Sequence, residues 1–463
     1  MKFQKIMSVG LAAVILALGV SGCGEKNKAE DGKIAVSIGD WPDKTNPKNQ
    51  ERYEGYLAQM KEKYPDIVIT PDTYVFETKT FSMKASANQL PTMYGSWFTE
   101  VKNIIKSNYA ADATNVMKKN GILDSINPSL LKMVSSDDGK VYGFPVSAYA
   151  QGLTYNKAIF KEAGLVNADG SIKIPDTYEE LAEFSKIIRD KTGKAGIVLD
   201  TANNCGGWHF MNIAWSFGVN FMQQGADGKW KATFNTPEAV AALQYVKDLK
   251  WKYNALPDNT VIDQSEGHKI FGTAQAAMVI ADPKDIYCTK FGMNKDDLGV
   301  ARMPKGPAGR YAQTGGDLKM FAPGSTDEQI DACFKWLDLI GYGKDLDEQS
   351  IENKKKSYQN TLDKNGIVFG REALPVWVNE DRVKKQAEIA ADYVNIDPKD
   401  FDSYYSFEDV TLRAEEPVAC QQLYSVLDGC IQEVITNQNA DPAKLIADAC
   451  SDFQANHLDH VEQ

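Results

Sequence analysis

The sequence is poor in the residues that most enzymes use for catalysis or for metal binding. It has four histidines, no His-Glu-x-x-His pattern, no Gly-x-Ser-x-Gly nucleophile motif and no Gly-x-x-x-x-Gly-Lys-Ser/Thr phosphate loop. Two of the histidines, His457 and His460, lie in a polar C-terminal stretch, which favours a solvated face over a zinc site. No spacing among the 63 acidic residues singles out a carboxylate pair of the kind that glycoside hydrolysis requires. We therefore expect no catalytic residue, no metal and no cofactor.

Positive charge is also scarce. The 463 residues include 51 Lys and Arg against 63 Asp and Glu, so the net charge is −12. Nucleic acids and anionic lipid head groups attract basic faces, and this balance therefore argues against both as partners. An apolar share of 43% and a charged share of 25% are ordinary for a soluble globular chain, which excludes a disordered or polytopic membrane protein. At about 100–200 residues per domain, the length predicts two or three domains.

Long apolar runs are absent except near the N-terminus. Lys2 and Lys5 precede an apolar run at residues 6–20 that is too short to span a bilayer comfortably, which predicts a signal peptide at 1–22. The small residues before Cys23 resemble a bacterial lipobox, in which the cysteine is acylated and becomes the mature N-terminus; the alternative is a plain signal peptide. Loss of two lysines would change the net charge from −12 to −14. We expect residues 23–32 to form a lipidated N-terminus and flexible tether, and a monomer anchored through Cys23 to the extracytoplasmic face of the bacterial cell membrane.

Cysteine is too sparse elsewhere for a disulfide scaffold, and no Cys-x-x-Cys pair suggests zinc or redox chemistry. Several of the six downstream cysteines lie at apolar helical positions, which predicts buried free thiols. A local bridge between Cys420 and Cys430 is the alternative. The six positions are Cys205, Cys288, Cys333, Cys420, Cys430 and Cys450.

The apolar pattern alternates between strands and helices. Two β-rich runs at residues 33–38 and 67–70 flank an apolar helical stripe, which predicts a β-α-β beginning. Capping boxes that begin at Thr177 and Thr326 mark two further helix starts. Residues 196–199, 276–281 and 318–322 are expected to be strands, and the chain beyond about residue 380 mostly helical. The predicted class is α/β with mixed sheets and a helical tail. No flexible linker separates the predicted domains, which favours short crossovers and a hinge.

A series of motifs resembles the bacterial extracellular sugar-binding proteins, the solute-binding group of ABC importers that includes maltose-binding protein. The central signature covers residues 143–165 and 175–181, and further matches follow in the family's order along residues 33–345. The sequence departs from the family pattern at residues 282–284, where many members carry a tryptophan, and in a longer region after Gly343. The further matches lie at residues 121–124, 271–278, 301–307 and 315–316 and at the capping box of Thr326.

This resemblance implies a two-lobed α/β fold of the periplasmic-binding-protein type, class II, with a ligand cleft between lobes joined by a hinge. It also implies that the protein captures a carbohydrate and delivers it to ABC-transporter permease subunits. The crossover-like segments near Tyr149 and Met303 set the expected boundaries. Lobe one comprises residues 33–148 and 304–345, and lobe two comprises residues 149–303 and 346–463.

Sugar recognition needs flat aromatic faces and fixed polar groups. Three tryptophans lie in turn-like or glycine-rich surroundings, Tyr149 lies at the first crossover, and three aspartates follow strand-like runs. Packing tryptophans and turn or N-cap aspartates are the alternative interpretations. The predicted binding residues are Trp41, Asp43, Trp97, Tyr149, Trp208, His209, Asp282, Asp317 and Trp377.

The number of these aromatic residues favours an oligosaccharide over a monosaccharide. The candidate loops offer mainly acidic and neutral groups, which disfavours an anionic ligand. A cationic polyamine is the alternative ligand, because aromatic rings and carboxylates bind it equally well. A polysaccharide-active enzyme or an adhesin is the remaining alternative, although the sequence shows neither the repeats nor the turn spacing typical of adhesins.

Overall fold

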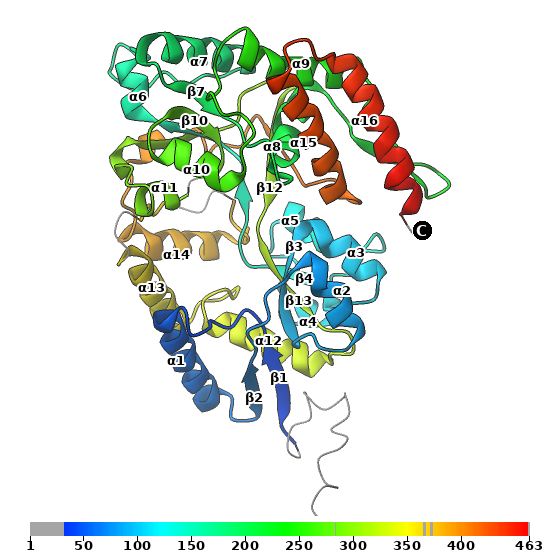
Figure 1. Ribbon diagram of the computed structural model, residues 1–463. Coiled ribbons are helices and arrows are strands. Elements are labelled where there is room, and N and C mark those ends of the chain that lie inside the picture. Colours follow the sequence, from blue (N-terminus) through cyan, green and yellow to red (C-terminus); the bar gives the residue numbers. More distant parts are fainter. Residues whose placement is uncertain (1–31, 283, 364–366, 371–373, 462–463) are drawn as a thin grey trace, which may run out of the picture.

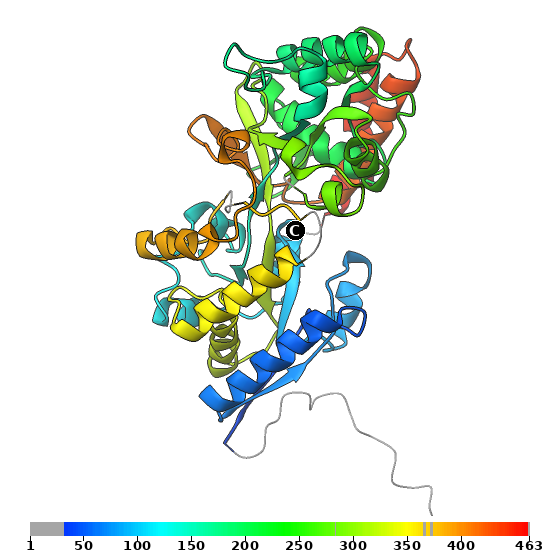
Figure 2. The ribbon, with the colours of Figure 1, turned by 90° about the vertical axis from the view of Figure 1, so that its left-hand side faces the viewer.

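The computed structural model describes residues 32–282, 284–363, 367–370 and 374–461. The predicted signal peptide and Cys23 lie outside the described residues. Figures 1 and 2 show two bodies, one above the other, with the N-terminal helix (blue) in the lower body and the C-terminal helices (red) in the upper one. We call the lower body lobe one and the upper body lobe two. No helix of the described part of the chain is long and apolar enough to cross a membrane.

Lobe one is built on a five-stranded sheet in the order β2-β1-β3-β13-β4. The predicted β-α-β beginning is confirmed, because α1 (Pro47–Lys63) joins the parallel strands β1 and β2. Strand β13 runs antiparallel to β3 and places Asp317 opposite Trp97. Helix α12 (Asp327–Leu339) packs against β1 and begins with the complete capping box predicted at Thr326. The strands are β1 (Ile34–Ile38), β2 (Ile67–Pro71), β3 (Met93–Trp97), β4 (Gly143–Pro145) and β13 (Asp317–Phe321).

The remaining helices of lobe one are short or stand on its outer side. Helix α13 packs against α12, and α14 packs against α13. The segment between α13 and α14 buries the side chains of Leu374, Val376 and Trp377 in the core of lobe one. The predicted boundary assigns this segment to lobe two. The boundaries of the lobes stay a prediction. These helices are α2 (Thr78–Ser86), α3 (Val101–Lys106), α4 (Thr114–Lys119), α5 (Pro128–Met133), α13 (Glu348–Leu362) and α14 (Glu380–Ala391).

Lobe two contains a four-stranded sheet in the order β11-β6-β10-β7, and every residue of these strands is buried. Continuous apolar strands of this kind are typical of a sheet covered on both faces. Helix α7 (Tyr178–Thr192) begins at the predicted N-cap Thr177 and ends at Gly193, whose φ of 71° suits a glycine C-cap. The strands are β6 (Leu153–Asn156), β7 (Ala195–Val198), β10 (Ala276–Ile280) and β11 (Leu298–Ala301).

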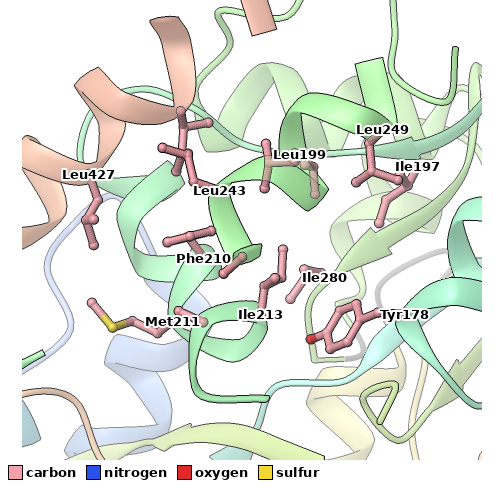
Figure 3. Packing of buried hydrophobic residues seen from close by; sticks show 14 of the residues in the cluster. Tyr178, Ile197, Leu199, Phe210, Met211, Ile213, Leu243, Leu249, Ile280 and Leu427 are labelled. Carbon is pink, nitrogen blue, oxygen red and sulfur yellow. The ribbon is translucent and has the colours of Figure 1, made fainter. Parts of the chain in front are cut away.

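The C-terminal helices complete the core of lobe two. Figure 3 shows Leu427 of α15 beside Phe210 of α8 and Leu243 of α9, with Ile197 and Ile280 from the sheet. Helices α8 and α15 lie so close that a Cβ added at Gly207 would stand 2.4 Å from the carbonyl oxygen of Tyr424. This contact fixes the start of α8 against α15. The helices around this core are α6 (Lys157–Glu162), α8 (Cys205–Phe217), α9 (Pro237–Trp251), α10 (Gln264–Gly272), α11 (Ile286–Thr289), α15 (Cys420–Thr436) and α16 (Pro442–Asn456).

A small three-stranded sheet lies between the two lobes. Strand β12 (Arg310–Gly315) pairs antiparallel with β5 (Tyr149–Ala150) and parallel with β14 (Val410–Arg413). The chain passes from β4 through β5 into lobe two, and it returns from β12 into β13 of lobe one (Figure 1). The structure therefore joins the lobes by strands rather than by a flexible linker. The outlying hairpin of β8 (Met222–Gln224) and β9 (Trp230–Ala232) belongs to lobe two.

The six downstream cysteines are free thiols, and all except the half-buried Cys205 are buried. The alternative bridge between Cys420 and Cys430 is wrong. Both residues lie on α15, ten positions apart, which corresponds to a separation of about 15 Å along a helix. A disulfide requires Cα atoms within about 7 Å of each other.

Candidate ligand-binding cleft

A cleft of about 360 Å³ lies where the two lobes meet, and we call it the central cleft. Both lobes and the connecting strands contribute to its walls. Such a volume is within the range of small-molecule sites, which is about 300–1,000 Å³. The lining residues are Trp97, Phe98 and Thr99 of lobe one, Tyr149, Gly315 and Gly316 of the connecting strands, and Asn203, Asn204, Cys205, Trp208, Gln264, Glu415, Gln421 and Tyr424 of lobe two.

Trp97 is one of two aromatic residues, with Phe98, that lobe one presents to this cleft. It ends β3, remains 44% exposed and packs edge-on against Phe76 with ring centroids 5.3 Å apart. Its other neighbours line a second hollow of about 310 Å³ within lobe one, which includes Asp317 and Tyr53. Both hollows share Trp97, and they therefore adjoin each other.

Trp208 faces the central cleft from the first turn of α8, and His209 lies behind it with ring centroids 4.5 Å apart. His209 is only 4% exposed, and its Nδ1 lies 3.3 Å from the carboxylate of Asp200. Burial lowers the pKa of His209 to about 3 and raises the pKa of Asp200 to about 7. His209 therefore supports the Trp208 ring from beneath and does not itself line the cleft.

The loop before α8 is held by the buried carboxylate of Asp428 on α15. Asp428 accepts the backbone N–H groups of Asn204 and Gly207, each at 2.7 Å. Asn203 and Asn204 both adopt left-handed backbone conformations, with φ of 57° and 69°, which asparagine tolerates better than most residues. Asp428 thereby fixes two amide side chains at the wall of the cleft.

Glu415 and Tyr424 form the polar end of the central cleft. The Tyr424 hydroxyl donates a hydrogen bond of 2.8 Å to Oε1 of Glu415. Burial raises the pKa of the Glu415 carboxyl to about 7 and raises the pKa of Tyr149 above its ordinary value. Gln421 accepts a hydrogen bond of 3.2 Å from the Asn204 side chain. These contacts fix several hydrogen-bonding groups before any ligand is present.

The structure brings four of the nine predicted binding residues to these hollows. Trp97, Tyr149 and Trp208 line the central cleft, and Asp317 lines the adjoining hollow in lobe one. Their contacts with a ligand stay a prediction.

Two predicted aromatic residues pack into the core of lobe one. Trp41 is 6% exposed and stacks on Trp336 with ring centroids 5.3 Å apart. Trp377 is also 6% exposed and packs against Phe144 at 5.7 Å. Both rings therefore fit the alternative interpretation, in which they are packing tryptophans, because an apolar neighbour covers each of them.

Two predicted aspartates are occupied by local contacts. The Asp43 carboxylate is exposed and accepts the Thr45 N–H at 2.8 Å, as in an Asx turn. Asp282 pairs with Lys284 at 2.7 Å. Neither aspartate lines the central cleft or its adjoining hollow.

Most polar groups of the central cleft were not among the binding residues predicted from the sequence. Four amides line it: Asn203, Asn204, Gln264 and Gln421. Glu415 is the single acid among the described lining residues, and no lysine or arginine occurs among them. The Asn203-Asn204 pair before a helix was a usable signal, whereas Glu415 and Gln421 lie in a tail that has no recognisable motif. Amides both donate and accept hydrogen bonds, and thus the arrangement suits an uncharged ligand rich in hydroxyl groups.

Glu415→Gln should change the pH dependence of stability. A Glu carboxyl titrates near 4.3 in an unfolded chain, whereas burial raises the pKa of Glu415 to about 7 in the native protein. The native state then retains a proton that the unfolded state releases, so stability falls as the pH rises from about 4.3 to about 7. Relative to the parent, the variant should gain unfolding free energy across this range, as measured by urea titrations at about pH 5 and about pH 8.

Glu408→Gln is the matched control, because Glu408 is exposed in the same segment of the chain. It should leave the difference between the two pH values unchanged. A Glu415→Gln variant whose stability relative to the parent stays constant between them would contradict the expected proton uptake.

The chain is similar to a known protein family and to individual proteins from bacteria. The model of the family described as bacterial extracellular solute-binding protein matches residues 46–340. A putative binding protein of Brucella abortus is 23% identical over 76% of this chain and 80% of its own length. The putative ABC transporter periplasmic-binding protein YcjN of Escherichia coli is 25% identical over 58% of this chain and 60% of its own length.

Among solved structures, the cyclic alpha-maltosyl-1,6-maltose binding protein of Arthrobacter globiformis superposes with a TM-score of 0.64. The match has 21% identity and covers 92% of this chain and 100% of that protein. This likeness confirms the predicted two-lobed α/β fold.

Proposed function

Because the chain belongs to the bacterial extracellular solute-binding protein family, we propose that it captures an oligosaccharide between its lobes, with neutral sugar units in the central cleft, and delivers it to the permease of an ABC importer. The choice of a sugar as ligand rests on one observation. The described lining of the central cleft combines aromatic rings with four amides and a single acid, without a lysine or arginine. The Arthrobacter relative in fold, named as a maltosyl-maltose binding protein, is consistent with this choice.

The positions of the rings support recognition of a sugar. Trp97 belongs to lobe one and Trp208 to lobe two, so a pyranose ring placed between the lobes has an apolar surface available from each. Hydroxyl groups at its edge would meet the amides of Asn203 and Gln264. The adjoining hollow in lobe one, which Trp97 also lines, offers room for a further sugar unit, which favours an oligosaccharide.

The test is a thermal-shift screen against neutral oligosaccharides, monosaccharides, amino acids and polyamines. A ligand at about 100 times its Kd should stabilise the protein by about 2.7 kcal/mol. Binding of a neutral sugar should barely respond to salt, whereas a polyamine complex should weaken as its charges are screened. Stabilisation by polyamines alone would replace the carbohydrate proposal with the alternative ligand.

Closure of the lobes is the expected response to ligand. The proposed boundaries are residues 33–148 with 304–345 for lobe one and 149–303 with 346–463 for lobe two, except that α13, α14 and residues 374–377 pack with lobe one. Contacts on both lobes should stabilise a closed form, so the radius of gyration from small-angle scattering should decrease with a saturating sugar. The same data should show a monomer. An unchanged radius at saturation would contradict the hinge.

Anchoring through Cys23 is proposed from the lipobox-like sequence. Cys23→Ser should abolish lipidation, because acylation requires the thiol, and the protein should leave the detergent phase in a partitioning assay. Ser21→Ala preserves both a small residue and the cysteine, and it serves as the control that should remain in the detergent phase. Unchanged partitioning of the Cys23→Ser variant would overturn the lipid anchor.

A further inference from the structure

The space between the lobes continues beyond the central cleft into a larger groove of about 920 Å³. We call it the outer groove and define it by Lys102 and Lys106 of lobe one and by Trp230, Gln422, His457 and His460 of lobe two. Figure 1 shows α3, which carries the two lysines, below the C-terminal end of α16. A ligand in this groove would again contact both lobes.

An intermediate hollow of about 400 Å³ shares lining residues with both the central cleft and the outer groove. Phe98, Thr99 and Glu415 line both the central cleft and this hollow. Lys102 lines both the hollow and the outer groove. The three spaces are therefore arranged in series, and an elongated ligand can extend from the first into the third.

Charge distinguishes the outer groove from the central cleft. Lys102, Lys106 and Asp137 line the outer groove, and Lys229 and Asp459 line the hollow that adjoins it at Trp230. Lys102 lies 3.6 Å from Asp137, but Lys106 and Lys229 have no carboxylate within ion-pair distance in the part of the chain that the structure describes. The adjoining Asp459 is engaged by the Gln454 amide at 2.7 Å.

A half-buried tryptophan stands among these cations. Trp230 lies in β9, and this strand is fixed to α16 by Gln454, which accepts the Ala232 N–H at 2.7 Å and donates to the Trp230 carbonyl at 3.3 Å. A fixed ring beside lysines provides an apolar surface for a sugar together with positive charge for an acidic substituent. The chain as a whole has a net charge of −12, whereas three lysines against two aspartates give these two spaces a small excess of positive charge.

We propose that the outer groove binds an anionic sugar residue at the far end of the oligosaccharide held in the central cleft. The anion is a carboxylate or a phosphate ester, and it pairs with Lys102 and Lys106 while Trp230 packs against the sugar ring. This inference rests on the proposed function, because the central cleft must hold the neutral part of the same ligand.

The test compares matched tetrasaccharides by calorimetry on the purified full chain. For each of the cello-, malto-, xylo- and manno- backbones, the probes are the neutral tetrasaccharide, the same compound with one terminal uronic acid, and the same compound with one terminal phosphate ester. For the backbone that binds, an acidic probe should bind at least about tenfold more tightly than the neutral one at about 50 mM salt, and this advantage should shrink at about 500 mM salt. The tighter acidic probe identifies the anion as carboxylate or phosphate.

Substitutions in the outer groove test whether its residues cause the tighter binding of the acidic probe. Lys102→Gln combined with Lys106→Gln should remove the advantage of the acidic probe and leave the affinity for the neutral probe unchanged. Lys118→Gln, at an exposed position of α4 outside the groove, should change neither affinity. Trp230→Phe, which retains a ring, should preserve most of the binding that Trp230→Ala loses.

Two outcomes separate this inference from the proposed function. Equal affinities for neutral and acidic probes, or an acidic advantage that survives the double lysine variant, would overturn the outer-groove proposal while the sugar-binding function stands. Failure of every probe to bind would overturn both.

Discussion

Trp208→Ala and Trp97→Ala should each weaken oligosaccharide binding by on the order of 1–3 kcal/mol, the usual magnitude for an apolar side-chain contact. This corresponds to roughly 5- to 150-fold in Kd. Trp97 lines the cleft from lobe one and Trp208 from lobe two, so each variant removes one of two opposed apolar surfaces. Calorimetry with the sugar that gives the largest thermal shift measures the loss.

Trp251→Ala is the matched control for the ring. Trp251 is 38% exposed, compared with 44% for Trp97, and lies on α9, outside the lining of the central cleft. It should leave Kd unchanged. Trp97→Phe should recover part of the affinity, because a smaller ring still presents an apolar face. If both alanine variants bind the sugar as tightly as the parent, these tryptophans are packing residues and the site assignment is wrong.

Arg310→Met should cost about 3 kcal/mol of unfolding free energy, because it removes charge-assisted hydrogen bonds from a buried position. The Arg310 side chain is 2% exposed and donates to the carboxylates of Asp176 at 2.7 Å and Asp409 at 3.1 Å. It also donates to the carbonyl oxygens of Asp176 and Met303. The variant removes the Arg310 donor from the Met303 carbonyl oxygen, whereas the Asp176 carbonyl oxygen still accepts the Lys305 N–H at 2.8 Å. Urea unfolding followed by tryptophan fluorescence measures the difference.

Arg302→Met is the matched control, because Arg302 pairs with the same two carboxylates but is 31% exposed. A pair that is open to solvent contributes only about 0–1 kcal/mol. Equal losses for the two variants would show that the carboxylates, and not the burial of Arg310, determine the contribution of this network.

The sequence predicted the secondary structure best where local chemistry determines it. Thr326 forms the complete capping box with Gln329, and Thr177 caps α7 through the Glu180 N–H, although the Glu180 side chain accepts from Asp176 instead of Thr177. Strand β14 was missed within the predicted helical tail. Its four residues pair with Arg310–Gln313, about a hundred positions earlier, and a local pattern cannot indicate such a partner.

The binding residues were harder to predict than the elements that carry them. Trp41 and Trp97 both lie in turn-like or glycine-rich surroundings, yet one ring stacks in the core on Trp336 and the other remains 44% exposed at the cleft. Turn-like surroundings show that a ring stands near the end of a strand, but not the direction in which the ring points. That direction depends on whether an apolar neighbour from another element covers it.

The sequence by itself determined the family, the α/β class and the starts of the main helices, because ordered motifs, hydrophobic periodicity and capping residues act within a few positions of the chain. The tertiary structure alone decided which side chains meet between the lobes. Glu415 and Tyr424 of the C-terminal region join Trp97, Tyr149 and Trp208 in one cleft. These residues lie up to about three hundred positions apart, and only the packing of α15 on α8 and the pairing of β12 with β5 bring them together.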